Sequence, residues 1–480
     1  MRLLLLVLLA GCATTQTAAP RPLAPATGDG PRCAWTGTPS VGSERWALEM
    51  DCAGLPPGWQ LLDLPGVAWA RLRGEATDEQ PLIGEWSAAD EAATVLERGA
   101  GSWAVLVPES GRLALGWRTA APAAAAAALQ SSRGGTMVAP YVARDHGFLR
   151  VDRALAVPRV PGLAVAGVRL RLPAGWTAAA PWPGADDLHP GELHPVDLHP
   201  VDLPDLLDNY VLVGDLDAAG GTLPSGSTWS VAVVRGHGLT AADLRPSLAA
   251  VLQQADRWFQ PPSGRFAFVV RPRWLGDDLE GTAGRSSAQG LIGDDPAATV
   301  EVLVHEYVHA WIPGHLSEAE RREHPAAWFD EGFTSWVTLR LLGAAGLVSP
   351  EEGLARMAAI DAVVEAAHAE APVGLRSLRR LAGRTLAERT LAYAGGAQLA
   401  GAVDLSDPDF WPHLMALLGT AEPGRGTAQF ADAVLQAGFP APWEAALDAL
   451  GKPLMEAVPP EFLHDGAPTD AFDAWWGLAP

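Results

Sequence analysis

The sequence predicts an α+β protein with several domains, in which an N-terminal antiparallel β domain is followed by a mixed central domain and a C-terminal helical domain. The chain has 480 residues, of which 48% are hydrophobic and 19% charged, so it can bury a large core. Short alternating segments separated by Gly and Pro dominate from about residue 32 to about residue 216, as expected of antiparallel strands. From about residue 240, longer segments with helical spacing follow.

The first twelve residues have the pattern of an export signal. Met1–Cys12 contains one Arg, an apolar run too short to cross a bilayer, and then L-A-G-C. This ending resembles a bacterial lipobox, which implies cleavage after residue 11 and a lipid on Cys12. Ala13 after the Cys implies sorting to the outer membrane of the bacterial cell envelope, so the chain would contact the membrane through its lipid anchor. The alternative is an ordinary signal peptide with an incidental Cys.

Residues 12–31 are rich in Ala, Thr, Pro and Gly and predict a flexible tether. The β domain is predicted over residues 32–225. Export places Cys33 and Cys52 in an oxidising compartment, where a disulfide between them is expected. Its loop of about 20 residues would stabilise the fold by roughly 3 kcal/mol in the chain-entropy model. Two buried free thiols are the alternative.

A short repeat at residues 187–204 places His189, His194 and His199 five residues apart, with acidic residues nearby. One hypothesis is a secondary metal-binding loop, and the other is a low-complexity insertion in an exposed loop. Pro recurs every five residues and forbids a helix, so the histidines share no helical face. This favours the insertion.

The chain is strongly acidic. Its 34 Lys and Arg stand against 56 Asp and Glu, which gives a formal net charge of -22. Binding to phosphate groups needs clustered basic side chains, so this balance excludes nucleic acid as the main partner.

The central domain, residues 226–348, and the helical domain, residues 349–480, are predicted from helices and one strand. Helical spacing predicts helices over 241–259, 296–312, 325–342 and 350–369, and the alternation at 265–272 predicts a strand. The last three helices open with Pro in the first turn. Asp295 is placed to cap one of them, and Ser349 with Glu352 has the spacing of a capping box.

The helix at 296–312 carries the motif H-E-x-x-H. His305 and His309 are four residues apart and therefore lie on one helical face, where they can bind one metal ion. Glu306 is rotated about 100° away, so it can approach a water on the metal without being a ligand. The alternative is a buried helix with two histidines that only make structural hydrogen bonds.

A third ligand is offered by the next helix. Glu331 lies 22 residues after His309, with a turn between them that lets the second helix return antiparallel. A catalytic zinc site usually has three protein ligands and one open position. A closed structural zinc site would favour cysteines, and none is available. The sequence therefore predicts Zn²⁺ bound by His305, His309 and Glu331.

These segments resemble the gluzincin metallopeptidases. H-E-Y-V-H-A-W followed by W-F-D-E-G-F-T is similar to the glycyl aminopeptidase family (peptidase family M61), with the M1 aminopeptidases as relatives. The longer spacing between His309 and Glu331 favours the former. The resemblance implies a thermolysin-like zinc domain at 226–348. It also implies that Tyr393, in Y-A-G-G-A, stabilises the transition state, although Gly395 stands where the family has Lys. A packed core tyrosine is the alternative.

Two departures from the family bear on specificity. The family's substrate-binding strand carries a Glu that holds a free amino terminus, and the corresponding stretch is taken to be residues 284–293, which has none. Aminopeptidase and endopeptidase modes are therefore both open. The family often ends in a PDZ domain, and the helical pattern after residue 349 predicts none.

The predicted function is a zinc peptidase acting on peptide or protein substrates. Glu306 would be the general base and Tyr393 would stabilise the oxyanion. Two alternatives remain: a catalytically retired, surface-anchored binding protein, and a zinc hydrolase for other amides or esters. The presence of Glu306 beside a full ligand set argues against the retired enzyme, because a structural zinc site has no need of a base.

Overall fold

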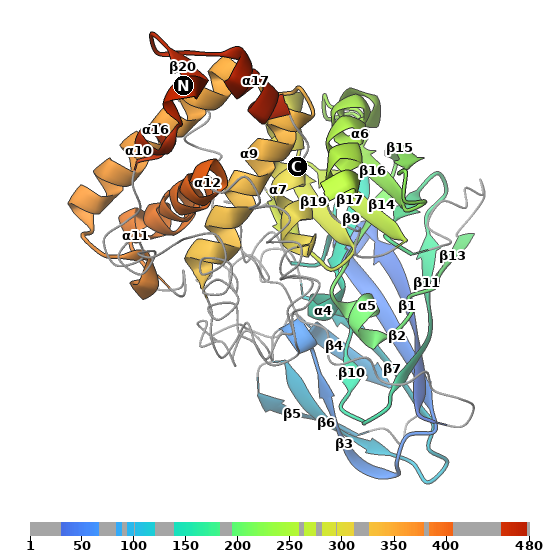
Figure 1. Ribbon diagram of the computed structural model, residues 1–480. Helices are drawn as coiled ribbons and strands as arrows, with labels where there is room; N and C mark the ends of the chain where they lie inside the picture. The colour runs from blue at the N-terminus through green and yellow to red at the C-terminus, as the bar shows by residue number, and fades with distance from the viewer. Residues whose placement is uncertain are drawn as a thin grey trace.

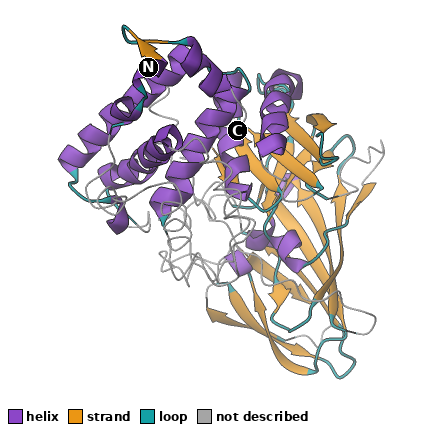
Figure 2. Ribbon diagram, viewed as in Figure 1, coloured by secondary structure: helices purple, strands orange, loops and turns teal. Residues whose placement is uncertain are grey.

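The computed structural model describes residues 30–66, 83–88, 94–99, 101–120, 139–182, 194–258, 264–274, 281–293, 295–311, 326–378, 384–406 and 453–477. The predicted mixture of sheets and a helical C-terminal region is confirmed (Figures 1 and 2). The predicted signal segment, Cys12 and nearly all of the tether lie outside the described residues, as does His189. Among the described residues, no helix combines the length and the apolar character that crossing a bilayer requires.

Three sheets form the N-terminal part (lower right in Figure 1). The largest has the order β13 (His194–Leu198), β11 (Ala164–Leu172), β1 (Arg32–Ser40), β2 (Arg45–Ala53), β7 (Leu113–Thr119), β4 (Ile83–Ala88). The second has the order β10 (Val157–Pro158), β3 (Gly58–Asp63), β6 (Ser102–Val107), β5 (Val95–Gly99). The third, here named the junction sheet, has the order β12 (Thr177–Ala179), β14 (Tyr210–Gly214), β9 (His146–Arg150), β8 (Tyr141–Val142). Neighbouring strands are antiparallel except β1 and β11, which run parallel.

One hydrophobic core joins these sheets. Trp35, Leu48 and Leu115 from the first sheet, Val105 from the second and Val213 from the junction sheet are all almost fully buried in it. The alternation of buried and more exposed residues along β1 and β2 matches the period of two that the sequence shows. Two short helices, α4 (Val151–Ala154) and α5 (Leu203–Leu207), connect the strands.

The predicted disulfide is confirmed. Cys33 on β1 and Cys52 on β2 face each other in register, are bonded to one another, and are completely buried. The bond therefore joins the two neighbouring strands near the start of the described chain.

The residues of the 187–204 repeat that the structure describes are only partly in a loop. His194–Leu198 forms β13 at the edge of the largest sheet, and His199, directly after it, is exposed. The expectation of a loop throughout this segment is therefore wrong for β13, where a Pro is tolerated because the strand lies at a sheet edge.

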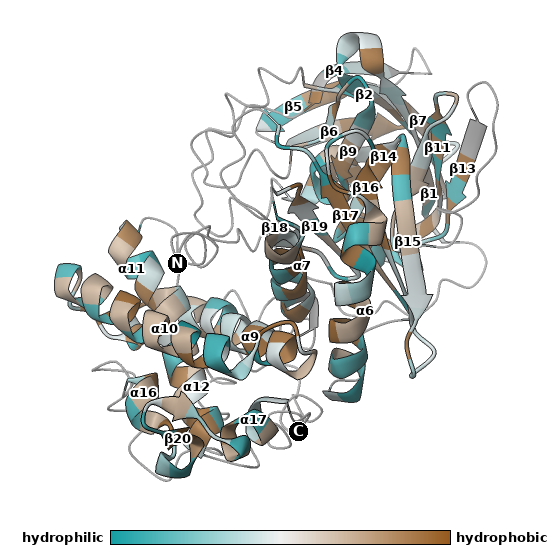
Figure 3. Ribbon diagram, turned by 90° about the horizontal axis from the view of Figure 1, so that it is seen from above, coloured by the Kyte–Doolittle hydropathy of each residue, from teal (hydrophilic) through white to brown (hydrophobic). Residues whose placement is uncertain are grey.

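A five-stranded sheet, here named the central sheet, follows. Its order is β15 (Leu216–Thr222), β16 (Thr228–Val234), β17 (Arg265–Arg271), β19 (Ser287–Leu291), β18 (Gly281–Ala283). The middle three strands are parallel, and β15 and β18 are antiparallel edge strands. β15, which falls within the range 32–225, pairs with β16 in this sheet. Helices α6 (Ala241–Trp258) and α7 (Pro296–Trp311) pack side by side against it (Figures 1 and 3).

The helical part lies on the far side of α7. It comprises α9 (Thr334–Ala344), α10 (Pro350–Glu370), α11 (Leu386–Thr390), α12 (Gly396–Ser406), α16 (Leu454–Ala457), α17 (Asp470–Gly477) and a small hairpin, β20 (Leu463–His464) and β21 (Ala467–Pro468). One hydrophobic cluster runs without interruption from the central sheet through α6 and α7 to α17. The central and helical parts therefore share one core.

Two predicted helix caps can be checked. Asp295 Oδ1 accepts the amide of Ala297 at 3.0 Å at the start of α7. Ser349 Oγ accepts the amide of Glu352 at the start of α10, but the Glu352 carboxylate pairs with Arg356. The cap at Ser349 is thus confirmed without the Glu352 half of the expected box. A complete capping box occurs instead at Thr385 and Glu388, which begins α11.

Candidate metal centre

The motif helix α7 presents two different faces. Val300, Leu303, Val304 and Tyr307 are almost fully buried at helical spacing, and the ring of Tyr307 packs edge-on against Phe266 of β17. This apolar face holds the helix against the central sheet. Because residues four apart share a face, His305 and His309 come together on another side, with their ring centroids 4.6 Å apart.

The three predicted ligands meet at one point. Nε2 of His309 lies 3.1 Å from Oε2 of Glu331, and Nε2 of His305 lies 3.6 Å from the same oxygen. One ligand atom from each residue lies within 4.8 Å of the others, and this group could hold a metal ion. Within the described part of the chain, no other such group of His, Cys, Asp or Glu was found.

Burial makes this group electrostatically unusual. His309 and Glu331 are essentially inaccessible to solvent, and His305 is only slightly exposed. Burial by itself raises the pKa of Glu331, but the charge of the facing His309 and the contacts with both imidazoles outweigh it and lower the pKa to about 2. Glu331 therefore keeps its negative charge, as a metal ligand must.

Glu331 lies on a π-helical segment, Trp328–Phe333, that precedes α9. A π-helical turn contains one extra residue and changes the direction in which side chains point. The hydroxyls of two residues that follow bond back to this segment: Ser335 Oγ donates to Glu331 O at 2.7 Å, and Thr334 Oγ1 donates to Asp330 O. Thr334 Oγ1 also lies 3.4 Å from Nδ1 of His309, so it contacts the ligand ring on the side away from Glu331.

Tyr393 lies on a second π-helical segment, Leu391–Gly395, which leads into α12. The Glu331 segment packs against this second segment and against the start of α12, where Gly332 meets Gly396 backbone to backbone; a Cβ on Gly332 would collide with the Cα of Gly396. Tyr393 is 4% exposed. The structure thus places Tyr393 on an element that contacts the Glu331 segment directly.

Glu306 is completely buried on α7 next to the ligand pair. Gly281, on the edge strand β18, faces the Glu306 side chain. A Cβ on Gly281 would lie 2.9 Å from both Cγ and Oε1 of Glu306 and 2.6 Å from Cγ1 of Val302. The absence of a side chain at Gly281 therefore provides the space that the Glu306 carboxylate occupies.

Replacing Gly281 by Ala should displace Glu306 while leaving the ligands His305, His309 and Glu331 in place. We expect bound metal to be unchanged and the rate of any Glu306-dependent hydrolysis to fall by about a hundredfold, as small displacements of a catalytic group do. Metal analysis and steady-state kinetics measure the two quantities. Gly264→Ala, directly before β17 of the same sheet and at a position where a Cβ meets nothing within 4 Å, is the matched control and should keep full activity.

The edge of the central sheet differs from the expectation for the substrate-binding strand. The stretch 284–293 contains β19, which is an interior strand between β17 and β18. In the part of the chain that the structure describes, the edge strand against α7 is β18, Gly281–Ala283. Sequence reasoning missed it because three residues are too few to show alternation. It also passed over Thr334, although its position three residues after Glu331 places both on one helical face.

No protein-family model matches the sequence, and no curated protein matches it. Many solved structures are similar in fold, among them the following three. They are an aminopeptidase N family protein from Idiomarina loihiensis (15% identity, 92% of this chain and 75% of that chain, TM-score 0.62), an M1 zinc metallopeptidase from Deinococcus radiodurans (15% identity, 89% and 94%, TM-score 0.55), and a mutant of that metallopeptidase bound to a Tyr-Ser-Ala substrate (15% identity, 88% and 94%, TM-score 0.54).

These likenesses extend over most of the chain and most of each solved structure. At 15% identity they concern the fold. The chain therefore has a multidomain α+β fold similar to that of M1 zinc metallopeptidases.

Proposed function

We propose that the protein is a zinc-dependent peptidase of the gluzincin type. The observation that carries the proposal is the buried group of His305, His309 and Glu331 on adjacent helices, with the carboxylate of Glu306 beside it. The fold similarity to M1 zinc metallopeptidases supports it. The spacing of 22 residues between His309 and Glu331 is our reason to group the chain with the glycyl aminopeptidases.

The residues fit a zinc ion. Imidazole nitrogen and carboxylate oxygen are common zinc donors, and three protein ligands leave a position open for catalysis. Nε2 of His305 is buried and, at 3.6 Å from Glu331, is beyond hydrogen-bonding distance. A metal ion would supply the partner that this buried nitrogen needs.

Bound zinc would supply a Lewis acid that activates water and polarises the scissile carbonyl. Glu306 accepts the proton of the attacking water and passes it to the leaving amine nitrogen. Tyr393 donates a hydrogen bond to the carbonyl oxygen as negative charge develops there. In this arrangement one helix, α7, carries both the general base and two of the three ligands.

Peptides or proteins are the proposed substrates. One similar structure contains a tripeptide substrate, which is the same class. Among the described residues β18 has a strand neighbour on one side only, and we propose that an extended peptide pairs along its other edge, beside Glu306.

We also propose that the protein is a lipoprotein of the bacterial cell envelope. The pattern of residues 1–12 supports cleavage before Cys12 and a lipid on its sulfur. The described residues begin at residue 30, and residues 12–31 would connect the folded part to the outer membrane. The predicted disulfide, which forms in exported proteins, is consistent with this location.

The proposal is tested by metal analysis together with digestion of a peptide library by the purified full chain. We expect about one zinc ion per chain, cleavage that a chelator abolishes, and recovery when zinc is added back. The positions of cleavage distinguish an aminopeptidase from an endopeptidase.

Other outcomes separate the alternatives. Zinc without hydrolysis of any substrate would favour the retired binding protein. Cleavage of anilides or esters but not of peptides would favour a different hydrolase. A chain that binds no zinc would contradict the proposal.

A further inference from the structure

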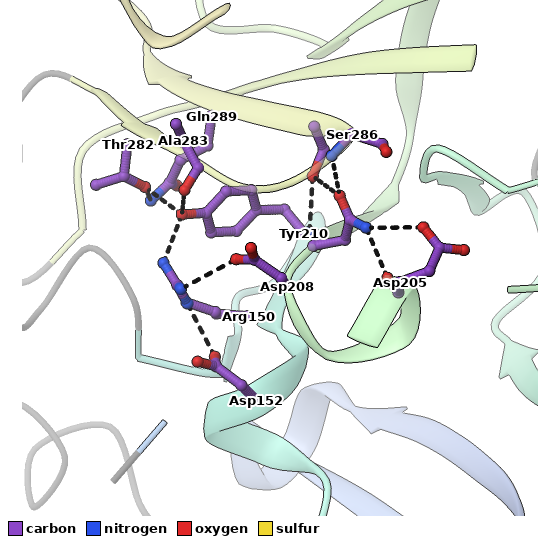
Figure 4. Close-up of polar contacts among 11 residues, drawn as sticks. Arg150, Asp152, Asp205, Asp208, Tyr210, Thr282, Ala283, Ser286 and Gln289 are labelled. Atoms are coloured by element: carbon purple, nitrogen blue, oxygen red, sulfur yellow. Dashed lines mark hydrogen bonds and ion pairs between the residues drawn. The ribbon is translucent and has the colours of Figure 1, made fainter. Parts of the chain in front are cut away.

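A buried chain of polar side chains connects the junction sheet to the edge of the central sheet (Figure 4). Arg150 lies at its centre and is 1% exposed. Its Nε donates to Oδ1 of Asp152 at 2.8 Å, its Nη1 donates to the hydroxyl of Tyr210 at 2.8 Å, and its Nη2 lies 3.6 Å from Asp208. Ionised groups are buried only where each has a partner, so these contacts fix the guanidinium in one orientation.

The hydroxyl of Tyr210 is the point at which this chain reaches β18. It lies 2.7 Å from Oγ1 of Thr282 and 3.0 Å from the carbonyl oxygen of Ala283. A carbonyl can only accept, so the Tyr210 hydroxyl donates to Ala283 and accepts from Arg150. Burial raises the pKa of the Tyr210 phenol, so the hydroxyl keeps the proton that it donates.

Thr282 also accepts a hydrogen bond from the neighbouring strand β19. Nε2 of Gln289, on β19, donates to Oγ1 of Thr282 at 3.0 Å. Oε1 of Gln289 in turn accepts from Nε of Arg271, on β17, at 3.0 Å. The donors therefore run in one direction, from Arg271 through Gln289 and Thr282 to Tyr210 and Ala283, and all five residues are fully buried.

The turn between β18 and β19 is attached to the same segment of the N-terminal part. Asp208 O accepts the amide of Arg285 at 2.7 Å. Oδ1 of Asn209 accepts the amide of Ser286 at 2.9 Å and the hydroxyl of Ser287 at 2.7 Å. Three consecutive residues, 208–210, thus hold both β18 and the turn that follows it.

The opposite face of β18 contacts the candidate metal centre. Side chains of neighbouring strand residues point to opposite faces, so Thr282 faces Tyr210 while the position of Gly281 faces Glu306 on α7. A shift of this three-residue strand toward or away from Tyr210 would move the backbone that lies against Glu306.

We propose that Arg150 and Tyr210 are positioning residues for the reaction: through Thr282 and Ala283 they fix β18 relative to Glu306, and so fix the register in which a peptide pairs with the strand. This role rests on the proposed peptidase function. The N-terminal β part would thus contribute to the active site by holding β18 in place, although it contains neither a metal ligand nor the general base.

The test compares Tyr210→Phe with Tyr141→Phe in the full chain. Tyr141 is the matched control, because it is also fully buried in the junction sheet and its hydroxyl bonds to His146 at 2.8 Å. With a tripeptide, kcat/KM of Tyr210→Phe should fall by about tenfold or more, whereas an aminoacyl anilide, which has no peptide group beyond the scissile amide to pair with β18, should lose less than about threefold. Zinc content should not change.

Two further measurements separate positioning from general damage. Amide hydrogen exchange at residues 281–284 should be faster in Tyr210→Phe than in wild type and unchanged in Tyr141→Phe. Arg150→Lys keeps the charge but not the forked geometry, so it should reproduce the preference of Tyr210→Phe for the anilide over the tripeptide.

The possible results distinguish failure of the positioning role from failure of the peptidase proposal. Equal effects of the two tyrosine variants on the tripeptide, the anilide and the exchange rates would overturn the positioning role while leaving the peptidase proposal standing. A wild-type chain that cleaves no peptide of the library, or that cleaves peptides equally well after Glu306→Gln, would overturn the proposed function and this role with it.

Discussion

Glu306→Gln should leave zinc in its site and remove hydrolysis. The substitution keeps the size of the side chain, so the packing against Gly281 and the arrangement of the three ligands are preserved. The amide cannot accept the proton of the attacking water, and loss of a general base lowers the rate by about a hundredfold to ten-thousandfold. We expect kcat/KM to fall by at least about a thousandfold, measured with the peptide that wild type cleaves fastest.

The control is Glu301→Gln, the same change one and a half turns earlier on α7. Glu301 pairs with Arg356 at 3.0 Å and has no part in the metal group. We expect its activity to stay within about twofold of wild type, since a partly exposed ion pair contributes little. If Glu306→Gln and Glu301→Gln are equally active, Glu306 is not the base.

Glu331→Gln should release the metal. The carboxylate of Glu331 is the only negative charge in the ligand group, and an uncharged amide is a poor zinc ligand. Loss of one of three protein ligands should lower zinc affinity by several orders of magnitude, and activity at ordinary zinc concentrations should disappear with it. Zinc content after dialysis and a zinc titration of activity measure the two effects.

Glu331→Asp is a second variant, which separates the effect of the charge from that of the side-chain length. Aspartate keeps the negative charge but is one methylene shorter, so it should bind zinc more weakly than wild type and more tightly than Glu331→Gln. Wild-type zinc affinity in Glu331→Gln would contradict the ligand assignment. Because no metal then contributes to the stability of the folded state, Glu331→Gln should also lose the thermal stabilisation by added zinc that wild type shows.

The three metal ligands could be predicted from the sequence, because their positions follow from helical periodicity and from the length of the turn between two helices. Helical periodicity alone brings His305 and His309 to one face, and a turn of sufficient length lets Glu331 return to them. The same rules located α6, α7, α10 and β17 to within a few residues. The alternating pattern and the turn residues likewise predicted a β-rich N-terminal part.

The π-helical segments and the buried charged residues could not be predicted, because they depend on contacts between segments that are distant in the sequence. Helical periodicity does not distinguish the π-helical segments at 328–333 and 391–395 from ordinary helices, and the close approach of Gly332 to Gly396 joins residues 64 apart in the sequence. Arg150 and Asp152 look like surface residues in a sequence, since charged side chains are mostly exposed. They are buried as partners of one another, and the distant residues Asp208 and Tyr210 complete the contacts of Arg150.

The packing of Gly332 on Gly396 also limits how this protein can be divided. The segment that carries Glu331 is built directly on the segment that carries Tyr393, and Trp476 near the chain end fills the space left by Gly343 and Gly353 on α9 and α10. The helical part thus packs directly against the segment that carries the ligand Glu331. A fragment that ends after α9 would contain all three ligands, but it would lack the surface that holds one of them in place.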